Sequence, residues 1–188
     1  MVLDKFRLDG KIAVVTGGTR GIGRAIAVAL AEAGADIAAV SRTPHPYIEK
    51  SILSLGRRYR HHSADLTDRE QTRKVIPTLA EQMGDPDILI NNAGIIRRAP
   101  AAEHSAEDWD DTLESDLTAA FMLSQAVGRI MLEKKAGKII NIASVLSFQG
   151  GVNVAAYVAA KHGLAGLTKA LANISKLTGP QFLHIVTK

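Results

Sequence analysis

Residues 16–23 read Thr-Gly-Gly-Thr-Arg-Gly-Ile-Gly and lie between two stretches with clear secondary-structure patterns. The residues before them, 12–15, read Ile-Ala-Val-Val, which is typical of a strand covered on both faces in a parallel sheet. The residues after them carry one apolar stripe at helical spacing: Ile22, Ala25, Ile26, Ala29, Leu30 and Ala33. Glycines in such a turn let the amides at the start of a helix approach a phosphate. The stretch therefore predicts a strand, a phosphate-binding turn and a helix.

The alternation of strand and helix continues along the chain. Further strands are predicted at residues 36–40, 60–64, 88–91 and 138–143, and helices after Pro46 and at residues 69–83, 106–132 and 155–172. This order predicts an α/β fold with a doubly wound parallel sheet and helices on both faces. The 188 residues suit a single domain.

Composition and charge narrow the class of protein. The chain has no cysteine, and its six histidines lack metal-ligand spacing, so we expect no metal site. The net charge is +4, but aromatic residues make up only 4%, so we expect no nucleic-acid partner. No apolar run is long enough to span a membrane, and the first residues lack a signal-peptide pattern. The sequence thus predicts a cytoplasmic protein with no membrane partner.

Further motifs follow at the ends of the predicted strands. Asp65-Leu66 follows the third strand, Asn91-Asn-Ala-Gly94 follows the fourth, and Ser144 follows the fifth, with Tyr157 and Lys161 on the next helix. Taken singly, the aspartate could cap a helix and the asparagines could form a turn. Together with the pattern T-G-x-x-x-G-x-G, the set resembles the short-chain dehydrogenase/reductase family from about residue 6 to residue 173. The resemblance implies a Rossmann-like fold, a nicotinamide cofactor and a small-molecule substrate.

The expected cofactor-binding residues follow from the family resemblance, and the expected type of nicotinamide cofactor follows from the charged residues among them. The cofactor-binding residues are Gly17, Thr19, Arg20, Gly21, Ile22, Gly23, Ser41, Arg42, Asp65, Leu66, Asn92, Tyr157 and Lys161. The end of the second strand reads Val40-Ser-Arg42, where an NAD-dependent enzyme typically has an acidic residue. A hydroxyl and a guanidinium suit a 2′-phosphate, and Arg20 adds positive charge. We therefore expect NADP, with NAD as the alternative.

The expected catalytic residues are Ser144, Tyr157, Lys161 and Asp116. Residues four apart share one face of a helix, so Tyr157 and Lys161 can point into one cleft, where an ammonium favours phenolate. The family resemblance implies that the tyrosine is the general acid/base, that the serine holds the substrate oxygen, and that the lysine also binds the nicotinamide ribose. Asp116 stands where the family usually has asparagine. We expect its charge to weaken the field that favours phenolate and to slow turnover at neutral pH.

The substrate is less closely defined. Arg97 and Arg98 follow the Asn-Asn-Ala-Gly motif and Gln149 follows Ser144, in segments that resemble sugar-acid dehydrogenases of the 2-deoxy-gluconate type. Arg97 could pair with a carboxylate and Gln149 could bind a hydroxyl, whereas the arginines could equally be solvated. The alternative substrate is a 3-oxoacyl thioester.

The last residues depart from the family pattern. We expect a dinucleotide-binding Rossmann domain over residues 1–173 and an atypical tail at residues 174–188, as in a C-terminally truncated member. Residues 182–186 have strand-like apolar content. A catalytically impaired form that only binds nucleotides or dimerises is therefore a second possible function. The resemblance also implies a homodimer, formed through the helix that carries Trp109 and Phe121 and the helix that carries Tyr157.

Overall fold

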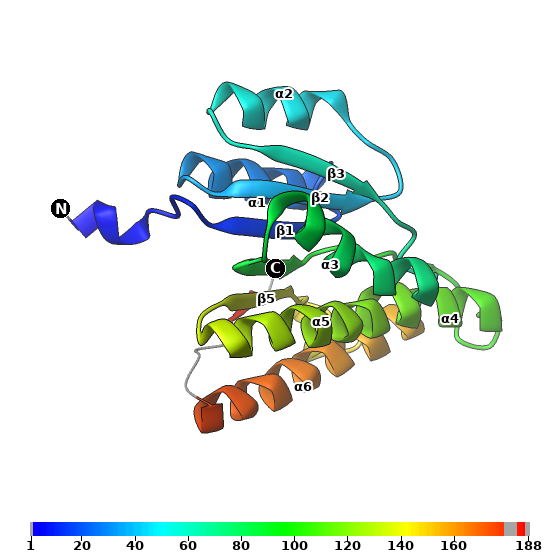
Figure 1. The fold of residues 1–188 in the computed structure, drawn as a ribbon. Helices are drawn as coiled ribbons and strands as arrows, with labels where there is room; N and C mark the ends of the chain where they lie inside the picture. The colour runs from blue at the N-terminus through cyan, green and yellow to red at the C-terminus, as the bar shows by residue number, and fades with distance from the viewer. Residues whose placement is uncertain (1, 179–183, 187–188) are drawn as a thin grey trace.

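One parallel sheet organises the molecule. The structure, a computed structural model, describes residues 2–178 and 184–186. Within these residues six strands pair in the order β3-β2-β1-β4-β5-β6, and every pair is parallel (Figure 1). The strands are β1 (Ile12–Thr16), β2 (Asp36–Ser41), β3 (Tyr59–Ser63), β4 (Ile88–Asn91), β5 (Lys138–Ile142) and β6 (His184–Val186). The strand order reverses between β1 and β4, where sheets of this kind bind ligands at their carboxyl edge.

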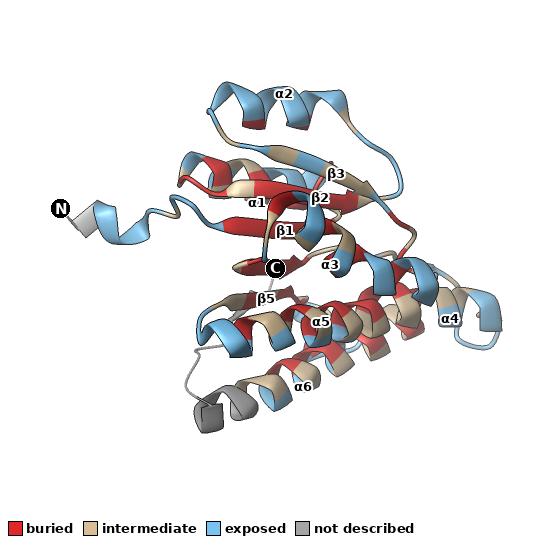
Figure 2. Cartoon of the chain, viewed as in Figure 1, coloured by how far each residue is buried: buried red, intermediate tan, exposed pale blue. Residues whose placement is uncertain are grey.

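Helices cover both faces of the sheet. They are α1 (Gly21–Glu32), α2 (Pro46–Ser54), α3 (Arg69–Met83), α4 (Ala106–Leu113), α5 (Ala119–Lys134) and α6 (Ala155–Thr178). Successive strand residues face opposite sides, so Val14 packs in a cluster with α3 and α5, and Val15 packs in another with α1 and α2. Figure 2 shows these buried layers on the strands and on the inner helix faces. The predicted fold class is confirmed.

The structure differs from the prediction most clearly in the helix expected at residues 106–132. That stretch is α4, a π-helical segment (Glu114–Thr118) and α5. A π turn inserts one extra residue into the helix, and here Ser115 and Asp116 within it are buried. Apolar periodicity cannot reveal such a turn, because the helical pattern continues on both sides. None of the helices in the described part of the chain is long and apolar enough to cross a membrane.

Two elements near the end of the chain also bear on the predictions. α6 extends beyond the expected end at residue 172 and reaches Thr178. Residues 184–186 form β6 beside β5, in the strand position anticipated for residues 182–186, whereas residues 182 and 183 lie outside the described residues. The division of the chain at residue 173 stays a prediction.

Candidate active site

The glycine turn between β1 and α1 has the geometry of an anion cradle. Gly17 and Gly21 have φ values of +63° and +53°, a region that glycine adopts without strain. A Cβ on Gly23 would lie 2.3 Å from the carbonyl oxygen of Gly17, whereas a Cβ on Gly21 would meet nothing within 4 Å. Arg20, at the N-cap, gives α1 no side-chain cap. The first amides of α1 are therefore available to a phosphate, and the turn fits a dinucleotide.

A cavity of about 610 Å³ opens over this turn at the carboxyl edge of the sheet. It is lined by Gly17, Thr19, Arg20, Gly21, Ile22, Gly23, Ser41, Arg42, Asp65, Leu66 and Asn92, among others. These are the expected cofactor residues other than Tyr157 and Lys161. The structure thus brings together residues from the ends of four strands in a space of the size that binds cofactors.

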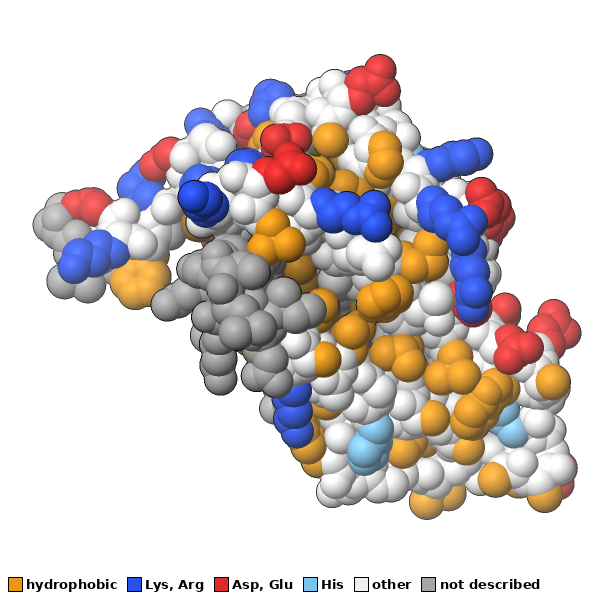
Figure 3. All heavy atoms as spheres, turned by 60° about the horizontal axis from the view of Figure 1, so that its bottom comes forward, with side chains coloured by type: hydrophobic (Ala, Val, Ile, Leu, Met, Phe, Trp, Pro, Cys, Tyr) orange, Lys and Arg blue, Asp and Glu red, His pale blue; other side chains and the backbone are white. Residues whose placement is uncertain are grey.

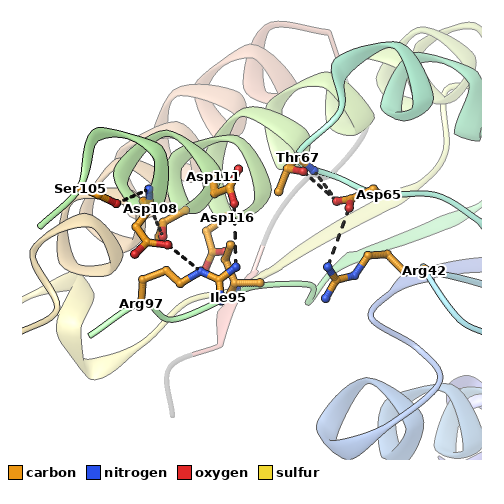
Figure 4. Close-up of polar contacts among 10 residues, drawn as sticks. Arg42, Asp65, Thr67, Ile95, Arg97, Ser105, Asp108, Asp111 and Asp116 are labelled. Atoms are coloured by element: carbon orange, nitrogen blue, oxygen red, sulfur yellow. Dashed lines mark hydrogen bonds and ion pairs between the residues drawn. The ribbon is translucent and has the colours of Figure 1, made fainter. Parts of the chain in front are cut away.

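Asp65 does not cap a helix; Asp68 does, by accepting hydrogen bonds from the amides of Glu70 and Gln71. One oxygen of Asp65 accepts hydrogen bonds from the amide and the hydroxyl of Thr67, at 3.0 and 2.9 Å (Figure 4). Its other oxygen lies 3.8 Å from the guanidinium of Arg42, which is 64% exposed. Asp65 and Arg42 therefore form an ion pair at the lining of the larger cavity.

The turn that follows β4 is tied to β1 by a residue that the sequence analysis did not single out. The hydroxyl of Thr16 accepts hydrogen bonds from the amides of Asn92 and Ala93, at 3.0 and 2.9 Å. The side-chain amide of Asn92 donates to the carbonyl of Thr16 at 2.9 Å. Thr16 ends the first strand immediately before the glycine turn, and this position is the feature of the sequence that could have identified it as a contact residue. The bonds place Asn92 at the boundary between the larger cavity and the next one.

That next cavity, of about 250 Å³, is lined by three of the four expected catalytic residues. Ser144, Tyr157 and Lys161 all line it, together with Ile22 and Asn92, which also line the larger cavity. The ammonium of Lys161 donates to the carbonyl of Ile142 at 3.2 Å and lies 5.4 Å from the ring centre of Tyr157. The hydroxyl of Ser144 accepts from the amide of Leu146 at 3.2 Å. The three side chains therefore share one space that adjoins the cofactor-sized cavity.

Asp116 is buried behind this set, in the π-helical segment. One carboxylate oxygen accepts the amide hydrogen of Ile95 at 2.7 Å (Figure 4), and the other lies 3.4 Å from the ammonium of Lys161. A Cβ on Gly94 would come within 2.6 Å of that second oxygen. Burial raises the pKa of Asp116, although Lys161 and the Ile95 amide oppose the shift. Asp116 thus contacts Lys161 and the segment after β4 at once.

Of the three expected substrate residues, Ser144 lines the smaller cavity and the other two, Arg97 and Gln149, do not. Arg97 lines the larger cavity and pairs with Asp108 at 3.1 Å and with Asp111 at 3.9 Å (Figure 4). Gln149 is exposed and is not among the residues that line the two cavities. Among the residues that the structure describes, no group of three His, Asp or Glu side chains could hold a metal ion.

The profile of the short chain dehydrogenase family matches residues 11–181. The 2-dehydro-3-deoxy-D-gluconate 5-dehydrogenase of Pseudoalteromonas atlantica is 43% identical over 175 residues, which cover 92% of this chain and 69% of that protein. A gluconate 5-dehydrogenase from Burkholderia cenocepacia, solved with NADP and tartrate, superposes with a TM-score of 0.91 at 36% identity, covering 100% of this chain and 74% of that one. A candidate NAD(P)-dependent gluconate 5-dehydrogenase from Beutenbergia cavernae, with NADP at low occupancy, gives 0.90 at 45% identity, covering 97% and 73%. With its motifs, its sheet and most of its length matched, this chain belongs to the short-chain dehydrogenase family.

Proposed function

We propose that this chain is an NADP-dependent oxidoreductase that interconverts a hydroxyl and a keto group on a sugar acid of the 2-deoxy-gluconate type. One observation carries the proposal: the cavity over the glycine turn adjoins the cavity lined by Ser144, Tyr157 and Lys161, and Ile22 and Asn92 line both. A bound NADP supplies or accepts the hydride. The residues of this chain then have to hold the substrate and move one proton.

In this proposal Tyr157 is the general acid/base. The ammonium of Lys161 lies 5.4 Å from its ring centre, so a positive charge stands beside the group that would exchange the proton. Lys161 uses one hydrogen on the carbonyl of Ile142, which leaves donors for Asp116 and for a ribose hydroxyl. The hydroxyl of Ser144 accepts from a backbone amide, so its own hydrogen can be donated to the substrate oxygen. Tyr157→Phe should therefore lower kcat by at least about a hundredfold while NADPH still raises Tm. Turnover at the wild-type rate would exclude this role.

We further propose that Asp116 slows turnover at neutral pH. Its carboxylate lies 3.4 Å from the ammonium of Lys161, and an ionised carboxylate there cancels part of the positive field on Tyr157. Asp116→Asn keeps an acceptor for the Ile95 amide but removes the charge. The variant should move the rising limb of the pH–rate profile to lower pH. An unmoved profile would contradict this role.

Two features support NADP as the cofactor. Arg20 and Arg42 line the larger cavity and supply positive charge at the end expected to hold the ribose. The Burkholderia cenocepacia and Beutenbergia cavernae structures were solved with NADP. NAD remains the alternative, and direct titration with both nucleotides distinguishes them.

The names of the relatives support a sugar-acid substrate. The contact of Arg97 with its carboxylate stays a prediction, because that guanidinium is paired with Asp108 and Asp111 here. The contact of Gln149 with a hydroxyl also stays a prediction. Assaying NADP with 2-deoxy-gluconate against NADPH with an acetoacetyl thioester compares the two substrate classes. Faster turnover of the thioester would overturn the sugar-acid proposal.

We also propose a homodimer formed through α4, α5 and α6. Trp109 on α4 and Phe121 on α5 are 38% and 43% exposed, and hydrophobic side chains reach the surface on the helical face shown in Figure 3. Exposed apolar surface on the helices through which the family resemblance implies a dimer supports an interface there. Sedimentation as a stable monomer would contradict the dimer. A cytoplasmic location also stays a prediction.

The deciding experiment adds NADPH and a keto sugar acid and follows both Tm and NADPH absorbance. A rise in Tm together with substrate-dependent oxidation supports the proposed function. A rise in Tm without oxidation supports the nucleotide-binding alternative, because binding alone stabilises the folded chain. No rise and no oxidation would overturn both.

A further inference from the structure

The hydroxyl of Ser41, at the end of β2, has three hydrogen-bond partners. It lies 2.8 Å from the carbonyl oxygen of Thr43, 3.1 Å from the hydroxyl of Thr19 and 3.0 Å from Nε2 of His61. Ser41, Thr19 and Thr43 line the larger cavity, whereas His61 lies on β3 and is not among its lining residues. His61 therefore contacts this part of the cavity only through another residue.

Counting hydrogens assigns a direction to each of these bonds. A hydroxyl has one hydrogen to donate and two lone pairs that accept. The carbonyl of Thr43 can only accept, so Ser41 donates its hydrogen there. Thr19 and His61 must then both donate to Ser41, which requires a hydrogen on Nε2 of His61. With its single hydrogen used, the hydroxyl of Ser41 has none left for a ligand.

The turn after β2 is held by β3. The hydroxyl of Ser63 donates to the carbonyl of Arg42 at 3.0 Å, and the amide of Ala64 donates to the carbonyl of Ser41 at 3.3 Å. His61 adds the side-chain contact to Ser41. Burial lowers the pKa of His61, so the ring is neutral at neutral pH and its single N–H serves this bond. The position from which Arg42 enters the cavity therefore depends on β3.

We infer that His61 is a positioning residue that sets the preference for NADP over NAD. Through Ser41 it holds the turn of residues 41–43, from which Arg42, now 3.8 Å from Asp65, would reach a 2′-phosphate. Only NADP carries that phosphate, so loss of the His61 bond acts on NADP and spares NAD. This inference rests on the proposed function, in particular on nucleotide binding in the larger cavity.

The test measures dissociation constants of NADPH and NADH by calorimetry for the wild type and three variants. His61→Leu removes the donor, and we expect NADPH to bind about fivefold more weakly with NADH changed less than about twofold. His61→Gln restores an N–H donor of similar reach, and should return NADPH binding to within about twofold of wild type. His62→Leu, which changes the neighbouring residue on the opposite side of the same strand, is the matched control and should leave both constants unchanged.

Each other outcome has a definite meaning. Unchanged NADPH binding in His61→Leu overturns the inference. Equal weakening of NADPH and NADH also overturns it, because that result marks a general structural role. Failure of His61→Gln to restore binding overturns the hydrogen-bond argument. A wild-type chain that binds neither nucleotide overturns the proposed function and this inference with it, whereas the first three results leave the proposed function standing.

Discussion

Placing a methyl group on Gly23 should disrupt the glycine turn. In Gly23→Ala the new Cβ would lie 2.3 Å from the carbonyl oxygen of Gly17 and 2.5 Å from the side-chain nitrogen of Asn92. The first contact is to backbone, so the turn must open. The second displaces the amide of Asn92 from its 2.9 Å bond to Thr16. Overpacking costs about 1–3 kcal/mol and the hydrogen bond about 1 kcal/mol, which together give about 2–4 kcal/mol.

For a chain of this length that loss should lower Tm by roughly 5–15 °C, measured by calorimetry. NADPH affinity should fall as well, because the same movement displaces the first amides of α1. Gly150→Ala is the matched control: Gly150 is exposed in a loop, its Cβ would meet nothing within 4 Å, and Tm and affinity should stay unchanged. Wild-type Tm and NADPH affinity in Gly23→Ala would refute the close-packing argument.

Three other variants test separate parts of the structure. Burial raises the pKa of Asp116 above 3.8, so the folded chain binds that proton more tightly than the unfolded chain, and stability falls as pH rises through the folded-state pKa. In urea unfolding, the stability of Asp116→Asn should therefore increase relative to that of wild type as the pH is raised above about 4, and a difference that stays constant with pH would contradict this. Arg42→Ala should weaken NADPH binding about tenfold and leave NADH binding nearly unchanged, and equal effects on the two would argue against a 2′-phosphate contact. Leu89→Ala, at a fully buried position on β4, should cost about 2–5 kcal/mol in urea unfolding, and a loss below about 1 kcal/mol would show that the core closes over the gap.

The fold and much of the site could be predicted because both depend on chain order. Apolar β-branched runs and helical stripes located most strands and helices, although β3 (Tyr59–Ser63) has a polar sequence. Parallel strands bring their carboxyl ends to one edge of the sheet. Residues that directly follow strands, such as Asp65, Asn92 and Ser144, therefore had to lie along that edge. The spacing of Tyr157 and Lys161 on one helix then placed both side chains in the same cavity.

The contacts that could not be predicted from the sequence are those between side chains that the tertiary structure brings together. Thr16 joins two turns because its strand pairs directly with β4, a register that no local pattern reveals. His61 reaches Ser41 for the same reason, through the pairing of β2 with β3. The contact of Arg97 with a substrate carboxylate stays a prediction, and its present partners, two aspartates one helical turn apart, are also known only from the fold. A long side chain can reach several possible partners, and the tertiary structure determines which of them lies close enough to contact it.

The buried carboxyl group of Asp116 should affect both the stability of the fold and the rate of the proposed reaction. Its carboxylate accepts a hydrogen bond from the Ile95 amide, and its second oxygen would lie 2.6 Å from a Cβ at residue 94, so a side chain there would displace it. An asparagine would keep the first of these contacts without a buried charge, so packing alone does not require an acid at this position. What the acid adds is a negative charge 3.4 Å from the ammonium of Lys161. When ionised, the carboxylate lowers stability because burial disfavours its charge, and in the proposed mechanism it weakens the field on Tyr157. Its effects on folding and on turnover should therefore disappear together when the carboxyl is protonated.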